Sequence, residues 1–117
     1  MSVETDIFAA LGPLVSNRVY PDTAPSIVTK PYITYQQVGG RSVSFLESAV
    51  PSRRNGRFQI NVWGVSRAEV SVLARTVSDT MVTITTLRAT PLGEPVADYV
   101  DMVKLYGTSQ DFGIWFP

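Results

Sequence analysis

Carboxylates and guanidinium groups are the side chains of this chain that could carry chemistry. Asp98 and Asp101 stand three positions apart, and Asp111 follows ten positions later. Paired carboxylates can exchange protons in general acid–base catalysis, and their oxygens can bind a hard cation. Nothing in the sequence places these three in a pocket, and further oxygen ligands at a fixed spacing are not evident. We therefore interpret them as carboxylates of solvated loops.

Cysteine and histidine are both absent from the 117 residues. Their absence excludes disulfide bonds, thiol nucleophiles, metal sites built from thiolate or imidazole, and catalysis by a histidine acid or base. Gly39-Gly40 precedes no predicted helix, so it does not resemble a loop that binds phosphate. We expect no catalytic residue, no metal and no cofactor.

Charge is balanced over the whole chain but unevenly placed along it. Ten basic and ten acidic residues give a formal net charge of zero, so no bulk attraction to nucleic acid is expected. Residues 41–57 carry four arginines against one glutamate, a net of +3, and residues 94–111 carry four acids against one lysine, a net of −3. The arginines are Arg41, Arg53, Arg54 and Arg57, and the acids are Glu94, Asp98, Asp101 and Asp111.

Four interpretations of these two charged segments stay open. They are two solvated loops, or they meet, either within one chain or between neighbouring copies. The arginines could alternatively contact a phosphate backbone, although they lack the interleaved aromatic residues of a single-strand binder.

Two tryptophans are further candidates for an interaction surface. Trp63 is out of phase with Phe58, Ile60 and Val62, and Trp115 is out of phase with the alternating residues 112–116. An aromatic side chain on a polar face is typical of an interface anchor. The alternative is that a second layer or the C-terminus covers these rings.

A strand followed by a helix must position most of these groups. Alternation over residues 58–62 predicts a strand with one apolar face. Ser66 and Glu69 form an S-x-x-E capping box, in which Ser66 caps a helix and Glu69 reaches back. The apolar stripe of this helix is Val70, Leu73, Ala74, Val77 and Met81.

The remaining elements are shorter. Ser2 can cap a first helix that ends at Gly12-Pro13, and its apolar residues are Ile7, Ala10, Leu11 and Leu14. β-branched and aromatic residues predict strands at 32–38, 82–89 and 110–116, with a short extended piece at 18–20. Residues 96–105 fit a helix, a strand or a loop equally well. Asn55-Gly56 predicts a turn, so we expect a mobile arm at about 39–56.

These elements predict a single α+β domain over residues 1–117, in the order α-β-β-β-α-β-β. We expect a mostly antiparallel sheet with both helices packed on one face, while the opposite face carries Gln59, Asn61, Trp63, Asp111 and Trp115. No apolar run approaches the ~18 residues of a membrane span. The N-terminus carries acids where a signal peptide carries basic residues, so we expect a cytoplasmic product.

The chain resembles the tail-completion proteins of long-tailed bacteriophages, the family of tail terminators and tail-to-head joining proteins. The resemblance rests on the order and spacing of ETDIFAALGPLV, NRVYPDTAP, PYITYQQV, RFQINVWGVSRAEVSVLARTV and LYGTSQDFGIWF. The most specific pieces are the FQINVWG strand that leads into the helix start and the DFGIW ending. Residues 39–54 and 91–105 match least.

The resemblance implies a structural protein of a phage or prophage virion tail. Such proteins assemble as a ring, usually a hexamer, that caps the tail tube and joins it to the head connector. Implied partners are other copies of the chain, the tail tube protein and the head connector protein, with DNA passing through the ring. It implies no enzymatic activity, cofactor, small-molecule substrate or membrane, and a location in the tail after assembly in the host cytoplasm.

The family supplies no site residues, so the candidate interface comes from the residues themselves. It comprises Arg41, Arg53, Arg54, Arg57, Trp63, Asp98, Asp101 and Trp115. Two other kinds of function stay open: a monomeric α+β module that binds a ligand or regulates a partner, and an enzyme that uses only carboxylates, serines or arginines.

Overall fold

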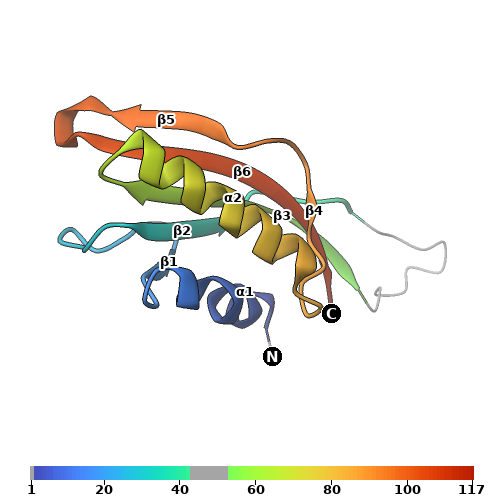
Figure 1. Cartoon of the computed structure of the whole chain (residues 1–117). Helices are drawn as coiled ribbons and strands as arrows, with labels where there is room; N and C mark the ends of the chain where they lie inside the picture. The colour runs from blue at the N-terminus through green and yellow to red at the C-terminus, as the bar shows by residue number, and fades with distance from the viewer. Residues whose placement is uncertain (1, 43–52) are drawn as a thin grey trace.

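A six-stranded sheet with two helices on one face forms the protein, as the computed structural model shows for residues 2–42 and 53–117 (Figure 1). The elements are α1 (Val3–Leu11), the 3-10 helix η1 (Gly12–Leu14), β1 (Val19–Pro21), β2 (Tyr32–Gln37), β3 (Arg54–Gly64), α2 (Arg67–Thr83), β4 (Thr90–Pro91), β5 (Val96–Val100), the 3-10 helix η2 (Asp101–Val103) and β6 (Leu105–Phe116). The α+β class and the predicted order of elements are confirmed.

The two longest strands, β3 and β6, pair antiparallel at the centre of the sheet. The strand order is β1-β2-β3-β6-β4, and β5 also pairs with β6. Only the β1–β2 pair is parallel among the pairings of the described strands. The sheet is therefore mostly antiparallel, as expected.

The core lies between the sheet and the two helices. Phe58, Ile60 and Val62 of β3 are buried there, which confirms the predicted parity of that strand. On the same face, β6 contributes Phe112, which pairs with Phe58, and Ile114, which pairs with Gly56. The helices add the buried residues Ile7, Ala10, Leu11, Val70, Ala74, Val77 and Met81.

Both helices begin where the sequence predicts. The Ser2 Oγ accepts a hydrogen bond from the amide of Thr5, and the Ser66 Oγ accepts one from the amide of Glu69, each at 3.2 Å. The Glu69 Oε1 reaches back to the amide of Val65, one residue before the cap, at 3.2 Å. The two serine contacts satisfy amides that the first turn leaves without a helical partner, and the Glu69 contact satisfies the amide just before the cap.

The predicted strand at 82–89 is wrong. Helix α2 continues to Thr83, and the strand that follows is only β4. The hydroxyls of Thr76, Thr80 and Thr83 donate to carbonyls one turn earlier, at 3.2, 2.8 and 2.7 Å. These bonds accommodate threonines in a helix despite their β propensity, and Met81 completes its buried stripe.

The turn predicted at Asn55-Gly56 is also wrong, because both residues lie within β3. A Cβ on Gly56 would lie 2.5 Å from the Phe58 ring and 2.9 Å from the Phe116 ring. Glycine is therefore required by the close approach of these two aromatic side chains, whose ring centroids are 6.1 Å apart. The predicted arm loses residues 54–56 to the strand, and its residues 43–52 lie outside the described part of the chain.

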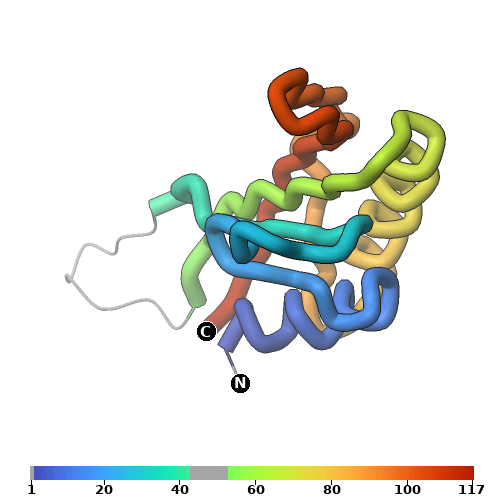
Figure 2. The backbone as a smooth tube through the Cα atoms, turned by 90° about the vertical axis from the view of Figure 1, so that its left-hand side faces the viewer, coloured from blue at the N-terminus to red at the C-terminus, as the bar shows by residue number. Residues whose placement is uncertain are grey.

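Residues 96–105, which fit three kinds of structure, form β5 and η2. Lys104 ends η2 in the left-handed conformation with φ 52°, and the chain turns there into β6. Figure 2 shows the resulting β5–β6 hairpin on the side of the molecule away from α1. This hairpin carries Asp98 and Asp101.

Candidate functional site

The sheet face that points away from the helices is polar. Register places Gln59 opposite Asp111, Asn61 opposite Ser109, and Gln36 opposite Gln59. The same register puts Trp63 and Trp115 on this face, because directly paired residues share a face. The structure thus confirms the face predicted for Gln59, Asn61, Trp63, Asp111 and Trp115.

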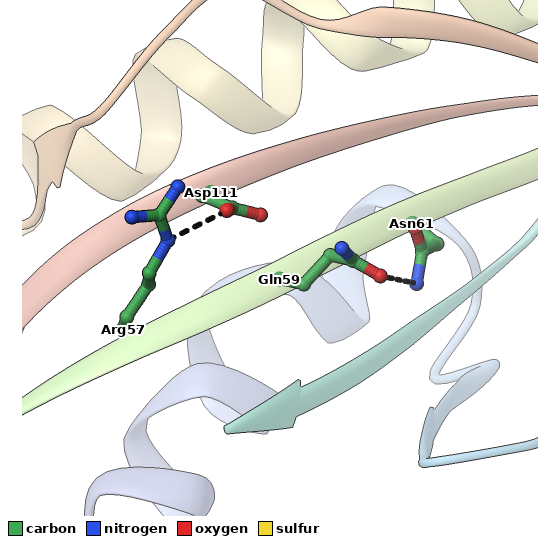
Figure 3. A network of polar contacts seen from close by, with 4 residues as sticks. All are labelled: Arg57, Gln59, Asn61 and Asp111. Carbon is green, nitrogen blue, oxygen red and sulfur yellow. Dashed lines mark hydrogen bonds and ion pairs between the residues drawn. The ribbon is translucent and has the colours of Figure 1, made fainter. Parts of the chain in front are cut away.

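One ion pair joins the two oppositely charged segments of the sequence on this face. The Nε of Arg57 donates to the Oδ2 of Asp111 at 2.7 Å, between β3 and β6 (Figure 3). Beside it, the Asn61 amide donates to the Gln59 Oε1 at 3.4 Å. The two charged side chains are 49% and 22% exposed, so the pair stabilises the fold by about 0–1 kcal/mol. At this point the basic and acidic segments meet within one chain.

The other three arginines gather at one end of the sheet, beside the C-terminus. Arg41, Arg53 and Arg54 are exposed and line an open pocket of about 400 Å³, which Phe116 also lines. An Nη of Arg53 donates to the carbonyl oxygen of Trp115 at 3.5 Å, and the Trp115 side chain is 45% exposed. We call Arg41, Arg53, Arg54 and Trp115 the arginine end.

Asp98 and Asp101 lie at the opposite end of the sheet. Arg54 pairs with Phe116, whereas Asp98 pairs with Gly107, nine residues earlier on β6. Nine residues of strand span about 30 Å. These carboxylates therefore cannot contact the arginine end of their own chain. Asp101 instead accepts a bond from the Lys104 Nζ at 3.4 Å, and both groups are exposed.

Trp63 is largely occupied by contacts within the chain. Its ring stacks on Tyr32 with centroids 6.5 Å apart, and its Nε1 donates to the Thr34 Oγ1 at 3.1 Å. It also lies over Gly107, where a Cβ would come within 2.6 Å of the indole ring. An intramolecular role accounts for these contacts, and a role for Trp63 as an interface anchor stays a prediction.

Arg67 is an important residue that the sequence analysis missed. Its guanidinium donates to the carbonyl oxygens of Asp98 at 2.6 Å and Gly107 at 2.9 Å, and lies 5.6 Å from the centre of the Tyr106 ring. The start of α2 is thereby fastened to both strands of the β5–β6 hairpin. Only a prediction of the β5–β6 pairing could have identified this role.

Two buried tyrosines have raised pKa values. Burial raises the pKa of Tyr32. Burial also raises the pKa of Tyr35, and the charge of Glu4, a hydrogen bond to Glu4 and the charge of Asp22 raise it further. Both phenols therefore stay neutral at ordinary pH, which suits a role in packing.

The described residues contain no group of three or more acidic side chains that could hold a metal ion. Residues 2–42 and 53–117 also contain no helix of the length and apolarity that a membrane span needs. The described residues form a surface with separate charged and apolar regions, and such a surface is suited to contacts between proteins.

Comparison with known proteins agrees with this architecture. The family model described as "Tail completion protein gp17" matches residues 5–97. Among solved structures, a chain of the "Virion of native gene transfer agent (GTA) particle" is similar, with a TM-score of 0.65, 18% sequence identity and coverage of 97% of this chain and 93% of that chain. At this identity the structural match shows a shared fold. A search of curated proteins found no match.

Proposed function

The chain belongs to the tail completion protein gp17 family, and we propose that this structural tail protein caps the phage tail tube as a ring and joins it to the head connector. The match over residues 5–97 carries the proposal. The fold shared with a chain of the gene transfer agent virion supports it.

A closed ring needs heterologous contacts, in which one patch of a subunit meets a different patch of the next. This chain offers two such patches, the arginine end and the β5–β6 hairpin with Asp98 and Asp101, which lie about 30 Å apart along β6. Repetition of one such contact around an axis closes a hexamer or another ring. We then expect the ring to be completed when the chain binds to the tail tube.

The arginine end has two possible uses in such a ring. Arg41, Arg53 and Arg54 can pair with Asp98 and Asp101 of a neighbouring copy, or they can face the tail tube, the head connector or the DNA that passes through. We favour the second use, because the β5–β6 hairpin also carries exposed apolar residues that suit a different surface of the neighbour. Trp115 beside these arginines would then contribute to the same contact.

Electron microscopy of the protein mixed with tail tubes of the same phage or prophage tests the proposal. We expect ring-shaped density at one end of each tube, and tubes with unchanged ends would contradict the proposed function. Changing Arg53 and Arg54 to Glu should then weaken attachment to tubes and leave contacts between copies intact. Loss of contacts between copies, restored when Asp98 and Asp101 are changed to Lys, would instead assign the arginines to the subunit interface.

A further inference from the structure

The turn of the β5–β6 hairpin exposes a group of apolar side chains. Met102 is 93% exposed, and Val103, Val100 and Tyr99 are exposed beside it. We call residues 99–104 the hairpin tip. Exposed apolar residues scattered singly are ordinary, but a contiguous group on a projecting turn is typical of a contact surface.

The hairpin tip is held in a fixed shape. Arg67 fastens both strands at its base, and the Tyr99 and Tyr106 rings pack with centroids 4.7 Å apart. The amide of Lys104 donates to the carbonyl oxygen of Asp101 at 3.2 Å, which closes the turn. A preorganised protrusion loses little conformational freedom on binding, so it is well suited to insertion into a partner.

An open groove of about 500 Å³ lies on another part of the same chain. We call it the apolar groove, because most of its lining is apolar: Leu14, Pro31, Ala68, Val72 and Leu73. Val72 is 63% exposed, and Leu73, predicted as part of the buried stripe, is only partly buried because it faces this groove. Its volume falls within the ~300–1,000 Å³ of typical binding pockets.

We propose that the hairpin tip of one subunit docks in the apolar groove of a second copy. The inference rests on the proposed ring, for which it supplies the contact between neighbours. Tip and groove are different patches, so their contact is heterologous and can repeat around an axis. Met102 and Val103 enter the groove and cover Val72 and Leu73.

The charges around both surfaces complement one another. Lys30 precedes the groove residue Pro31, and Glu69 lines the groove; both are exposed. The hairpin tip carries one exposed acid and one exposed base, Asp101 and Lys104. Docking can bring Asp101 to Lys30 and Lys104 to Glu69. The solvated Asp101–Lys104 pair contributes little on its own, so exchanging partners costs little.

Cysteine cross-linking tests this contact directly, because the chain has no cysteine of its own. Met102→Cys protein is mixed with Val72→Cys protein at high concentration, oxidised mildly and separated without reductant. We expect the mixed dimer to exceed both homodimers. Val82→Cys is the matched control, since Val82 is exposed on the same helix and does not line the groove.

A second mixture tests the rival head-to-tail contact, in which the hairpin tip meets the arginine end. Coupling of Met102→Cys to Arg53→Cys that equals or exceeds coupling to Val72→Cys would overturn the inference, as would coupling to Val72→Cys no greater than to Val82→Cys. Met102→Asp, at an exposed position, should keep the melting temperature and weaken self-association about tenfold, the effect of one lost interface contact.

Failure of the tip–groove contact can be distinguished from failure of the proposed tail function. If the tip–groove pair fails to cross-link while the parent protein still caps tail tubes, this inference fails and the tail function stands. If the pair cross-links and the tubes stay uncapped, copies do associate in this way and the tail function fails. Cross-linking of the tip to tail tube protein in preference to the groove would identify the tip as partner-facing and contradict the inference.

Discussion

The guanidinium group of Arg67 donates to the carbonyl oxygen of Asp98 at 2.6 Å and so joins the first turn of α2 to strand β5. The same group donates to the carbonyl oxygen of Gly107 on β6, so one side chain joins the start of α2 to both strands of the hairpin. The hairpin tip and the apolar groove both depend on α2, which begins at Arg67 and carries Val72 and Leu73. Their relative position within a subunit is therefore set at the start of this helix.

Arg67→Ala should destabilise the protein by about 1.5–3 kcal/mol, because it removes hydrogen bonds from a charged donor. Denaturant unfolding measures the loss, and amide exchange should show reduced protection in β5. Arg75→Ala, an exposed arginine of the same helix, provides the control and should be nearly neutral. Equal effects of the two changes would show that Arg67 does not hold the hairpin.

Gly107→Ala should destabilise the protein by about 1–3 kcal/mol, because the added methyl group would lie 2.6 Å from the Trp63 ring. Gly113→Ala on the same strand has its nearest neighbour, a Leu92 carbon, at 3.7 Å and should be tolerated. Thermal unfolding compares the two variants. A Gly107→Ala protein as stable as the Gly113→Ala protein would mean that Trp63 does not pack on β6.

Two valines of α2 should respond differently to truncation. Val70 is fully buried, so Val70→Ala should lower the free energy of unfolding by about 1–3 kcal/mol. Val72 lies in the open groove, so Val72→Ala should be nearly neutral for the isolated subunit. Denaturant titration tests both, and a large loss for Val72→Ala would place that side chain in the core.

Alkaline pH should destabilise the protein partly through Tyr35. Its pKa is raised in the folded state above the ordinary value of 10.0. This stabilisation is complete below pH 10 and is lost as pH rises through the folded pKa, because the unfolded chain then ionises more readily, at about 1.4 kcal/mol per pH unit. Tyr35→Phe should lose less stability above pH 10. Identical pH profiles would contradict the assignment.

Local patterns in the sequence predicted the helix starts and the central strand. Ser2 and Ser66 are N-cap residues next to helical sequence, and residues 58–62 alternate between apolar and polar side chains. The end of α2 was missed because Val82 and Thr83 are β-branched, while the apolar face that holds α2 on the sheet, which ends at the buried Met81, carries the helix on to Thr83. The turn predicted at Asn55-Gly56 was wrong because Gly56, which lacks a side chain, makes room for the rings of Phe58 on the same strand and Phe116 on β6. The second error comes from a long-range contact with Phe116, which a local pattern does not contain.

The sequence could place the residues proposed for an interface on a strand face, but it could not give their partners. The polar face followed from alternation along the strands. The 45% exposure of Trp115 did not, because alternation left open whether another part of the chain covers the ring. The pairing of Arg57 with Asp111, and the separation of the arginine end from Asp98, depend on the β3–β6 register. The apolar groove combines Leu14 of η1, Pro31 just before β2 and residues of α2. No single stretch of sequence therefore reveals it.

Growth of tail tubes tests the central claim most directly. Tubes of the same phage or prophage are incubated with the protein, fresh tube protein is added, and tube lengths are measured by electron microscopy. A ring on the tube end predicts that capped tubes keep their length while untreated tubes lengthen. Tubes that lengthen equally with and without the protein would contradict the claim that this chain terminates the tail.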